Sequence, residues 1–269
     1  MLELIFPEHR RIALPVDFKS HLTRKLAGVG IQSFEPLSQA AFLAAAERVE
    51  GEVIDIGANI GIFSLLTASA LGRPAHAFEP FGKPARVLSR AVERTGLPIT
   101  VNEAAVSDFD GSATLYLSRR SDMSNSLDAS HRVHAGQTEV RVCKIDSYVG
   151  ARRIAAIKID TERTEIQVLR GMTKLARTQQ PAVLLEVLPE TENGPLEQWA
   201  SEAGYQIHRL ADDPAFQAIT VRRDLPDRDG DGRNALLLPT AAPADAAFYK
   251  RVEHWLDRLA ACALQPTPA

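Results

Sequence analysis

One short segment constrains the fold more than any other: Asp55-x-Gly57-x-x-x-Gly61. Residues 53–56 are a short apolar run followed at once by glycines, which is typical of a buried strand. Residues 62–71 are apolar and rich in Ala and Leu, which predicts a helix. Glycine accepts the backbone angles of a sharp turn and lets a ligand approach the main chain. We therefore expect a strand, a tight turn and a helix whose N-terminus faces a small ligand.

Strand-like and helix-like segments alternate beyond this turn. Strands are predicted at 75–79, 99–101, 140–142, 156–160 and 182–187, and helices at 84–95, 165–175, 196–203 and 245–264. Residues 205–207 and 235–238 suggest a late antiparallel pair, and Asp110-Gly111 suggests a hairpin-like turn between 104–106 and 113–117. The alternation argues for an α/β fold with a mostly parallel sheet and helices on both faces.

The spacing of the glycines in the turn narrows the range of possible ligands. A dinucleotide fingerprint would have glycine at Asn59, and a P-loop would have Gly-Lys-Ser/Thr after Gly61. Asp55 suits a ligand with an ammonium group, and the helix N-terminus suits a carboxylate. S-adenosylmethionine carries both groups in its methionine portion. Glu79 ends the next strand, where an acid can accept hydrogen bonds from both ribose hydroxyls.

An ordered set of motifs resembles the FkbM family of methyltransferases. The matching pieces are VIDIGANIG (53–61), FEP (78–80), VNEAAVSD (101–108), IKIDTE (157–162), VLRG (168–171) and LLE (184–186). The resemblance implies a Rossmann-like methyltransferase fold with a mostly parallel seven-stranded sheet. It also implies S-adenosylmethionine-dependent O-methylation of a hydroxyl on a sugar, glycolipid, polyketide or related natural product.

The candidate cofactor residues follow from the turn, the strand-end acid and the resemblance. The turn and the acid contribute Asp55, Gly57, Ala58, Asn59, Gly61 and Glu79. The resemblance implies that the region of Asn102 and Ala105 lines the adenine. Asp160, at the end of a later strand, is added to this set.

Three charged residues are the candidate catalytic groups. Methyl transfer requires alignment and exclusion of water, and a hydroxyl acceptor benefits from a base. Asp160 and Glu162 lie at the predicted carboxyl end of a central strand, where ligand crevices of open α/β sheets lie. We hypothesise that Asp160 or Glu162 orients or deprotonates the acceptor and that Lys158 supports them. The alternative is a salt-bridged turn from Lys158 to Glu162, with Asp160 capping the next helix.

Arg163 departs from the family pattern. Family members usually show Lys-x-Asp-x-Glu-Gly, and here Arg163 occupies the glycine position after Glu162. A bulky cation thus stands where the strand should turn beside the cofactor. It either caps a loop or reshapes the substrate side of the site.

Two polar segments leave their roles open. Residues 118–138 form a long polar loop, which is typical of a lid, a binding loop or disorder. His131 and His134 in it can act as bases, but solvated side chains are the favoured interpretation. Asp227-x-Asp229-x-Asp231-Gly232 begins like a calcium loop, yet Leu238 stands where the last ligand belongs. It is interpreted as a tight acidic turn, and no metal is expected.

Length and charge set the remaining expectations. The 269 residues suit one large α/β domain, divided as an N-terminal segment and helix (1–50), the methyltransferase domain (51–240) and a C-terminal helix and tail (241–269). The net charge of −3 offers no basic field for nucleic acid. With no membrane span, a first segment that is a poor signal peptide and two distant cysteines, a cytoplasmic protein is expected. The resemblance implies a small-molecule or glycosidic acceptor as its partner. The alternatives are a non-catalytic S-adenosylmethionine-binding module and a nucleotide-dependent Rossmann enzyme.

Overall fold

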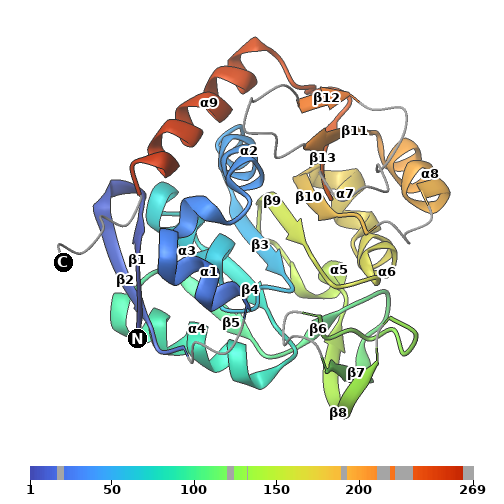
Figure 1. The fold of residues 1–269 in the computed structure, drawn as a ribbon. Helices are drawn as coiled ribbons and strands as arrows, with labels where there is room; N and C mark the ends of the chain where they lie inside the picture. Colours follow the sequence, from blue (N-terminus) through green and yellow to red (C-terminus); the bar gives the residue numbers. More distant parts are fainter. Residues whose placement is uncertain are drawn as a thin grey trace.

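A twisted central sheet organises the protein (Figure 1). The computed structural model describes residues 1–16, 21–119, 124–131, 133–188, 193–210, 219–221 and 233–262. Within these residues the sheet has eight strands in the order β12-β11-β13-β10-β9-β3-β4-β5. Their bounds are β3 Glu52–Ile56, β4 Ala75–Phe78, β5 Ile99–Asn102, β9 Ile154–Ile159, β10 Ala182–Glu186, β11 Tyr205–Leu210, β12 Ile219–Val221 and β13 Asn234–Pro239.

The strand directions confirm the expected Rossmann-like arrangement. β10, β9, β3, β4 and β5 pair in parallel, whereas β13 runs antiparallel to both β10 and β11. These seven strands are the mostly parallel sheet that the resemblance implies, and β11 with β13 is the predicted late antiparallel pair. The short strand β12 extends the edge beside β11 and falls in no predicted element.

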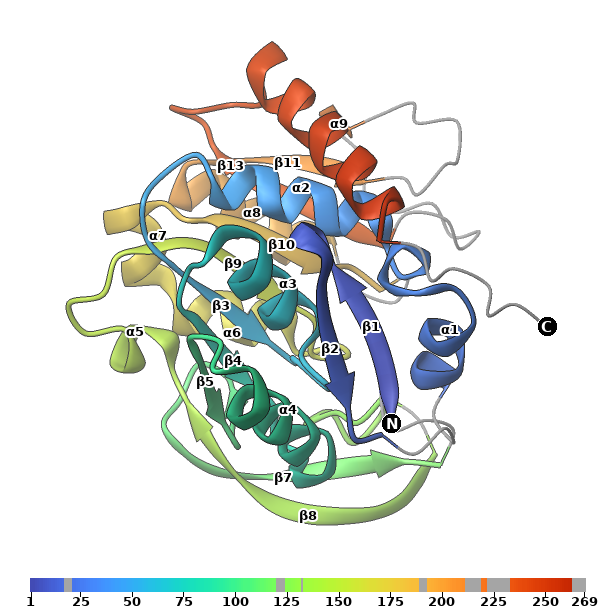
Figure 2. The ribbon, with the colours of Figure 1, turned by 90° about the vertical axis from the view of Figure 1, so that its left-hand side faces the viewer.

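Helices cover both faces of the sheet (Figures 1 and 2). One face carries α2 Pro36–Ala46, α3 Ile62–Leu71, α4 Gly82–Thr95 and α9 Ala246–Ala260, and the other carries α5 Ile145–Tyr148, α6 Glu165–Gly171, α7 Thr173–Gln179 and α8 Asn193–Ala203. In α9 the predicted apolar stripe of Phe248, Val252, Trp255 and Leu259 is buried. No helix in the described part of the chain is long and apolar enough to cross a membrane.

The single helix predicted at 165–175 is two helices. α6 ends at Gly171, and Met172 leaves the helical region with a φ of −123° before α7 begins. A Cβ on Gly171 would overlap the backbone carbonyl of Ser107. The close approach of this turn to the chain after β6 therefore requires glycine, and periodicity alone does not reveal such a contact.

The N-terminal segment adds a hairpin and a helix to the face that carries α3 and α4. Strands β1 Leu2–Phe6 and β2 Arg10–Leu14 pair antiparallel, and helix α1 His21–Val29 follows. The inward side chains of the hairpin belong to the same core as α2, α3 and α9. Figure 2 shows the hairpin beside α3 and α4.

A separate three-stranded sheet corrects the predicted hairpin around Asp110. Its strands are β6 Ala105–Val106, β7 Gly111–Ser118 and β8 His134–Cys143, and they lie in the order β6-β8-β7. Because β8 lies between β6 and β7, the prediction of a hairpin-like turn between 104–106 and 113–117 is wrong. The Asp110 carboxylate instead accepts hydrogen bonds from the Lys144 amide (2.9 Å) and the Ser147 hydroxyl (2.8 Å). The amide bond in particular lowers the pKa of Asp110. The predicted loop 118–138 is also too long, because β8 begins at His134.

Candidate active site

The turn between β3 and α3 is held in a form that its glycines permit. Gly57 has a φ of +74°, and a Cβ there would overlap the carbonyl oxygen of Asp160 at the end of β9. Gly61 has a φ of +82°, and a Cβ there would press against the Leu88 side chain of α4. Both glycines therefore combine a left-handed conformation with a crowded neighbour, and they keep β3, β9 and α4 close beneath the turn.

Asp55 supports this turn from below. Its Oδ2 atom accepts hydrogen bonds from the Ser64 amide (3.0 Å) and the Ser64 hydroxyl (2.7 Å), so it fixes the first turn of α3. Its Oδ1 atom is buried without a hydrogen-bond partner. Burial raises the pKa of Asp55, although the nearby Lys158 ammonium opposes this.

Glu79 follows β4 and reaches back across the turn. Its Oε2 atom accepts a hydrogen bond from the Asn59 amide and its Oε1 atom one from the Phe81 amide, both at 2.8 Å. Burial raises the pKa of Glu79 to about 7, against the lowering effect of these two amides. Each carboxylate oxygen retains acceptor capacity for a further donor.

These elements border a pocket with an empty volume of about 830 Å³, open solvent at its mouth included. One group of lining residues comes from the ends of β3, β4 and β5 and from β6: Ile56, Gly57, Ala58, Asn59, Phe78, Glu79, Pro80, Ala104, Ala105 and Val106. A second group comes from the rest of the chain: Leu22, Phe34, Ile62, Phe63, Leu115, Asn125, Ser126, Leu127, Lys158, Asp160, Thr161, Glu162 and Thr164.

Lys158 and Asp160 form a buried ion pair at the end of β9. Lys158 Nζ lies 2.9 Å from Asp160 Oδ2, and 4.9 Å from the centre of the Phe63 ring. Burial disfavours the Lys158 ammonium, but Asp160 and Asp55 outweigh it and hold its pKa above the ordinary value. The register of the sheet accounts for the influence of Asp55, because Lys158 lies opposite Asp55 on the neighbouring parallel strand.

Glu186, at the end of β10, shares a hydrogen bond with Asp160. Burial raises the pKa of Glu186 well above its usual value, and the charges of Asp160 and Glu162 raise it further. Burial acts on Asp160 in the same direction, but the Lys158 ammonium prevails and lowers the Asp160 pKa. Glu186 is therefore the protonated partner, and Asp160 is the carboxylate.

Glu162 and Arg163 occupy the loop between β9 and α6 in an unusual backbone conformation. Their φ angles are +56° and +85°, in the left-handed region that favours glycine. The family's glycine position is thus one where this chain places an arginine in a glycine-like conformation. Glu165 in α6 stabilises the loop by accepting hydrogen bonds from the Arg163 amide and the Thr161 amide, both at 3.1 Å.

Residues 124–131, the wall segment, close the pocket on this side. The Ser126 hydroxyl donates to the Glu162 carbonyl at 2.5 Å. His131 Nε2 lies 2.9 Å from Glu162 Oε2, and only 6% of the His131 side chain is exposed. The solvated interpretation of His131 is therefore wrong, because the wall segment docks on Glu162. His134 lies in β8, where its ring contacts Tyr116.

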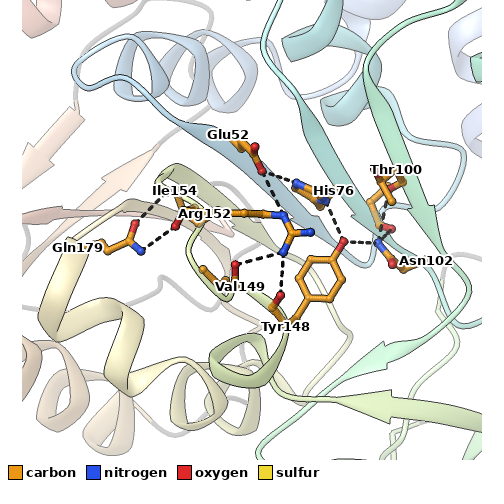
Figure 3. A network of polar contacts seen from close by, with 10 residues as sticks. Glu52, His76, Thr100, Asn102, Tyr148, Val149, Arg152, Ile154 and Gln179 are labelled. Carbon is orange, nitrogen blue, oxygen red and sulfur yellow. Dashed lines mark hydrogen bonds and ion pairs between the residues drawn. The ribbon is translucent and has the colours of Figure 1, made fainter.

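A polar network lies under the ends of β4 and β5 (Figure 3). The Tyr148 hydroxyl lies 2.8 Å from His76 Nδ1, and Glu52 Oε2 lies 2.6 Å from His76 Nε2. Asn102 donates to the same Tyr148 hydroxyl at 3.3 Å. The Tyr148 ring meets Phe78 edge to face at 4.8 Å between centres, so the network supports one wall of the pocket.

The pocket brings together most of the residues singled out from the sequence. Those lining it are Gly57, Ala58, Asn59, Glu79, Ala105, Lys158, Asp160 and Glu162. Asp55, Gly61 and Asn102 lie outside the lining and contact the protein instead. The acidic turn at 227–232 lies outside the described residues.

Several residues of the site were not singled out. Leu22 and Phe34 come from segments with no sequence signal for binding, and Ser126 comes from the long polar loop, where no single residue stands out. Glu186 did carry a signal, since it ends a strand next to the one that carries Asp160. A lysine within a buried strand also calls for carboxylate partners, which Lys158 finds in Asp55 and Asp160.

The strand order and the strand-end pocket define the class: a Rossmann-like methyltransferase. A family model described as Methyltransferase FkbM domain matches residues 55–207. The chain therefore belongs to the FkbM methyltransferase family. This confirms the resemblance, and the cofactor of the family is S-adenosylmethionine.

The relatives of known identity are distant. AMB antimetabolite synthetase AmbE of Pseudomonas aeruginosa is 26% identical over 220 residues, which are 65% of this chain and 10% of that protein. The structure of methyltransferase FkbM from Methylobacillus flagellatus KT shows 16% identity and a TM-score of 0.47, covering 74% of this chain and 47% of that chain. Magnesium protoporphyrin IX methyltransferase from Synechocystis PCC 6803 shows 10% identity and a TM-score of 0.45, covering 83% and 85%. The chain thus spans about a tenth of the synthetase and about half of the FkbM structure.

Proposed function

We propose that the protein transfers the methyl group of S-adenosylmethionine to a hydroxyl of a sugar, glycolipid, polyketide or related natural product. The observation that carries this proposal is the pocket itself. Glu79 lies among the strand ends, where an acid can accept hydrogen bonds from ribose hydroxyls, and the Glu162 carboxylate lies beside the wall segment. The AmbE relative is named as an antimetabolite synthetase, which accords with a natural-product acceptor.

The residues present suit the cofactor. Glu79 offers a carboxylate to the ribose hydroxyls, and its two amide bonds already fix its orientation. Ala105, Val106 and Leu115 supply an apolar surface for the adenine ring. The first turn of α3, braced by Asp55, supplies positive potential for the methionine carboxylate. When bound, S-adenosylmethionine supplies a methyl group on a positively charged sulfur.

Glu162 is a better candidate base than Asp160. Asp160 is committed to Lys158 at 2.9 Å, and its lowered pKa makes it a weak proton acceptor. Glu162 lines the pocket next to the wall segment, and its Oε2 atom lies 2.9 Å from Nε2 of the His131 imidazole. In this assignment the acceptor oxygen bonds to the methyl carbon, the C–S electron pair stays on sulfur, and Glu162 takes the hydroxyl proton. Lys158 and Asp160 hold the strand end in place.

Calorimetry and an acceptor panel test the proposal. The purified protein is titrated with S-adenosylmethionine, S-adenosylhomocysteine and NAD, and methyl transfer to a panel of sugars, glycolipids and polyketides is followed by mass spectrometry. Binding of the first two compounds together with transfer is expected. Binding without transfer across the panel indicates the non-catalytic module instead. Binding of NAD alone indicates a nucleotide-dependent Rossmann enzyme.

Variants then separate the carboxylates. Glu162→Gln should lower turnover about a hundredfold and leave S-adenosylhomocysteine binding intact, because general-base help is worth this much. Glu93→Gln on the exposed side of α4 is the matched control and should be neutral. Unchanged turnover in Glu162→Gln would overturn the assignment of Glu162 as the base.

A further inference from the structure

The wall segment is tied to the protein along both of its edges. On one edge Ser126 and Tyr116 exchange two backbone hydrogen bonds, of 2.9 and 3.2 Å, which attach the segment to β7. On the other edge Ser126 and His131 contact the carbonyl and the carboxylate of Glu162. A segment attached on both sides restricts the space in which the Glu162 side chain can turn.

Arg163 adds a second tie next to Glu162. Its Nη1 atom lies 3.5 Å from Asp128 Oδ2 and 3.5 Å from the Ser130 hydroxyl. Asp128 is itself ordered, since it accepts hydrogen bonds from the Ser130 amide (2.8 Å) and hydroxyl (2.7 Å). Although partial burial opposes it, these bonds and the Arg163 charge lower the pKa of Asp128, so its carboxylate is ionised.

This tie comes with backbone strain. A non-glycine residue in the left-handed region costs about 1 kcal/mol, and Glu162 and Arg163 occupy it in succession. Glycine at position 163 would relieve its part of the strain but would leave the Asp128 carboxylate without its cation. The strain is therefore retained together with contacts that only a long cationic side chain at this position can make.

We propose that Arg163 is a positioning residue for methyl transfer: it fixes the wall segment at the acceptor side of the pocket and thereby keeps the Glu162 carboxylate aimed into it. The inference rests on the proposed function for the role of Glu162. It also gives Arg163 a role that glycine at this position could not fill, because glycine has no side chain to pair with Asp128.

Hydrogen exchange measured by mass spectrometry on the whole protein tests this. Arg163→Gly should speed exchange in peptides covering the wall segment by about tenfold, with little change elsewhere and no loss of thermal stability. Arg163→Lys, which keeps the charge, should lie between this variant and the wild type. Gln180→Gly is the matched control: Gln180 also has a positive φ, +50°, but it follows α7 far from the wall segment in sequence. It should leave exchange in the wall segment unchanged.

A turnover measurement adds a functional readout. Arg163→Gly should lower kcat several-fold for an acceptor that the panel identifies and leave S-adenosylhomocysteine binding unchanged, because the wall segment lies at the acceptor side, and Gln180→Gly should change neither. Unchanged exchange of the wall segment in Arg163→Gly overturns the inference, as does a uniform rise in exchange across the protein. If the wild type fails to bind S-adenosylhomocysteine, the proposed function fails, while the exchange experiment still decides whether Arg163 fixes the wall segment.

Discussion

The carbonyl oxygen of Asp160 occupies the space that a Cβ on Gly57 would need. Gly57→Ala should therefore lower the free energy of unfolding by about 3 kcal/mol, through left-handed strain and overpacking together. Gly72→Ala separates the two effects, because Gly72 also has a positive φ, +64°, but open space around it. It should cost only about 1 kcal/mol in urea unfolding. Equal costs for the two variants would contradict the contact between β3 and β9.

Glu79 makes nucleoside binding depend on pH. Its pKa of about 7 means that protonation on acidification removes acceptor capacity from the pocket. 5′-Methylthioadenosine, which has the ribose and adenine but no ammonium or carboxylate, should bind about tenfold more weakly near pH 6 than near pH 8. A flat calorimetric profile would show that the Glu79 carboxylate does not receive the ribose.

The same residue should affect the stability of the free protein in the opposite direction. Because burial raises the Glu79 pKa above its ordinary 4.5, the folded state favours the neutral acid. Its contribution to stability is complete below that ordinary value and is lost as the pH rises through about 7. Subtracting urea-unfolding free energies of Glu79→Gln from those of the wild type should isolate this slope.

The proton shared by Asp160 and Glu186 should make their amide variants unequal. Glu186 is the neutral partner, so Glu186→Gln keeps a donor toward Asp160 and should change stability by less than about 1 kcal/mol. Asp160→Asn removes the carboxylate 2.9 Å from the buried Lys158 ammonium and should cost about 3 kcal/mol. Chemical denaturation at neutral pH measures both. The reverse ranking would place the proton on Asp160.

The Tyr148 hydroxyl joins His76 and Asn102 in one network. Tyr148→Phe preserves the ring contact with Phe78 but removes that junction, and should cost about 1–2 kcal/mol of stability. The imidazole NMR signals of His76 should shift at the same time, because one ring nitrogen loses its partner. Unshifted signals would mean that the network does not form in solution.

Local patterns predicted the elements around the turn well. The helix expected at 62–71 begins and ends as predicted, because Gly61 and Gly72 end it with positive φ angles that few other residues adopt. Strand β3 was predicted from the short run at 53–56, and all four of these residues are buried in the structure. The position of Glu79 just after β4 and at the pocket follows from the same kind of local pattern, and its role toward the ribose stays a prediction.

The predictions failed where the surroundings of a residue are supplied by distant parts of the chain. The β6-β8-β7 order depends on where β8 inserts, and nothing near Asp110 encodes this. His131 looked solvated because its burial depends on docking against Glu162, 31 positions later in sequence. The proton on Glu186 likewise depends on a neighbouring strand, because Asp160 follows β9 while Glu186 ends β10.

The pocket residues are supported by unlike parts of the fold. The residues around the ends of β3, β4 and β9 are built into the central sheet, where one added methyl at Gly57 collides with the backbone. Four other lining residues, Leu115, Asn125, Ser126 and Leu127, come from a surface hairpin and the wall segment attached to it. Selection can therefore vary the wall segment, and with it the range of acceptors, while Gly57 and Glu79 at the strand ends of the central sheet keep the donor end of the pocket in place. Diversification in this family should be sought in the stretch between β6 and β9.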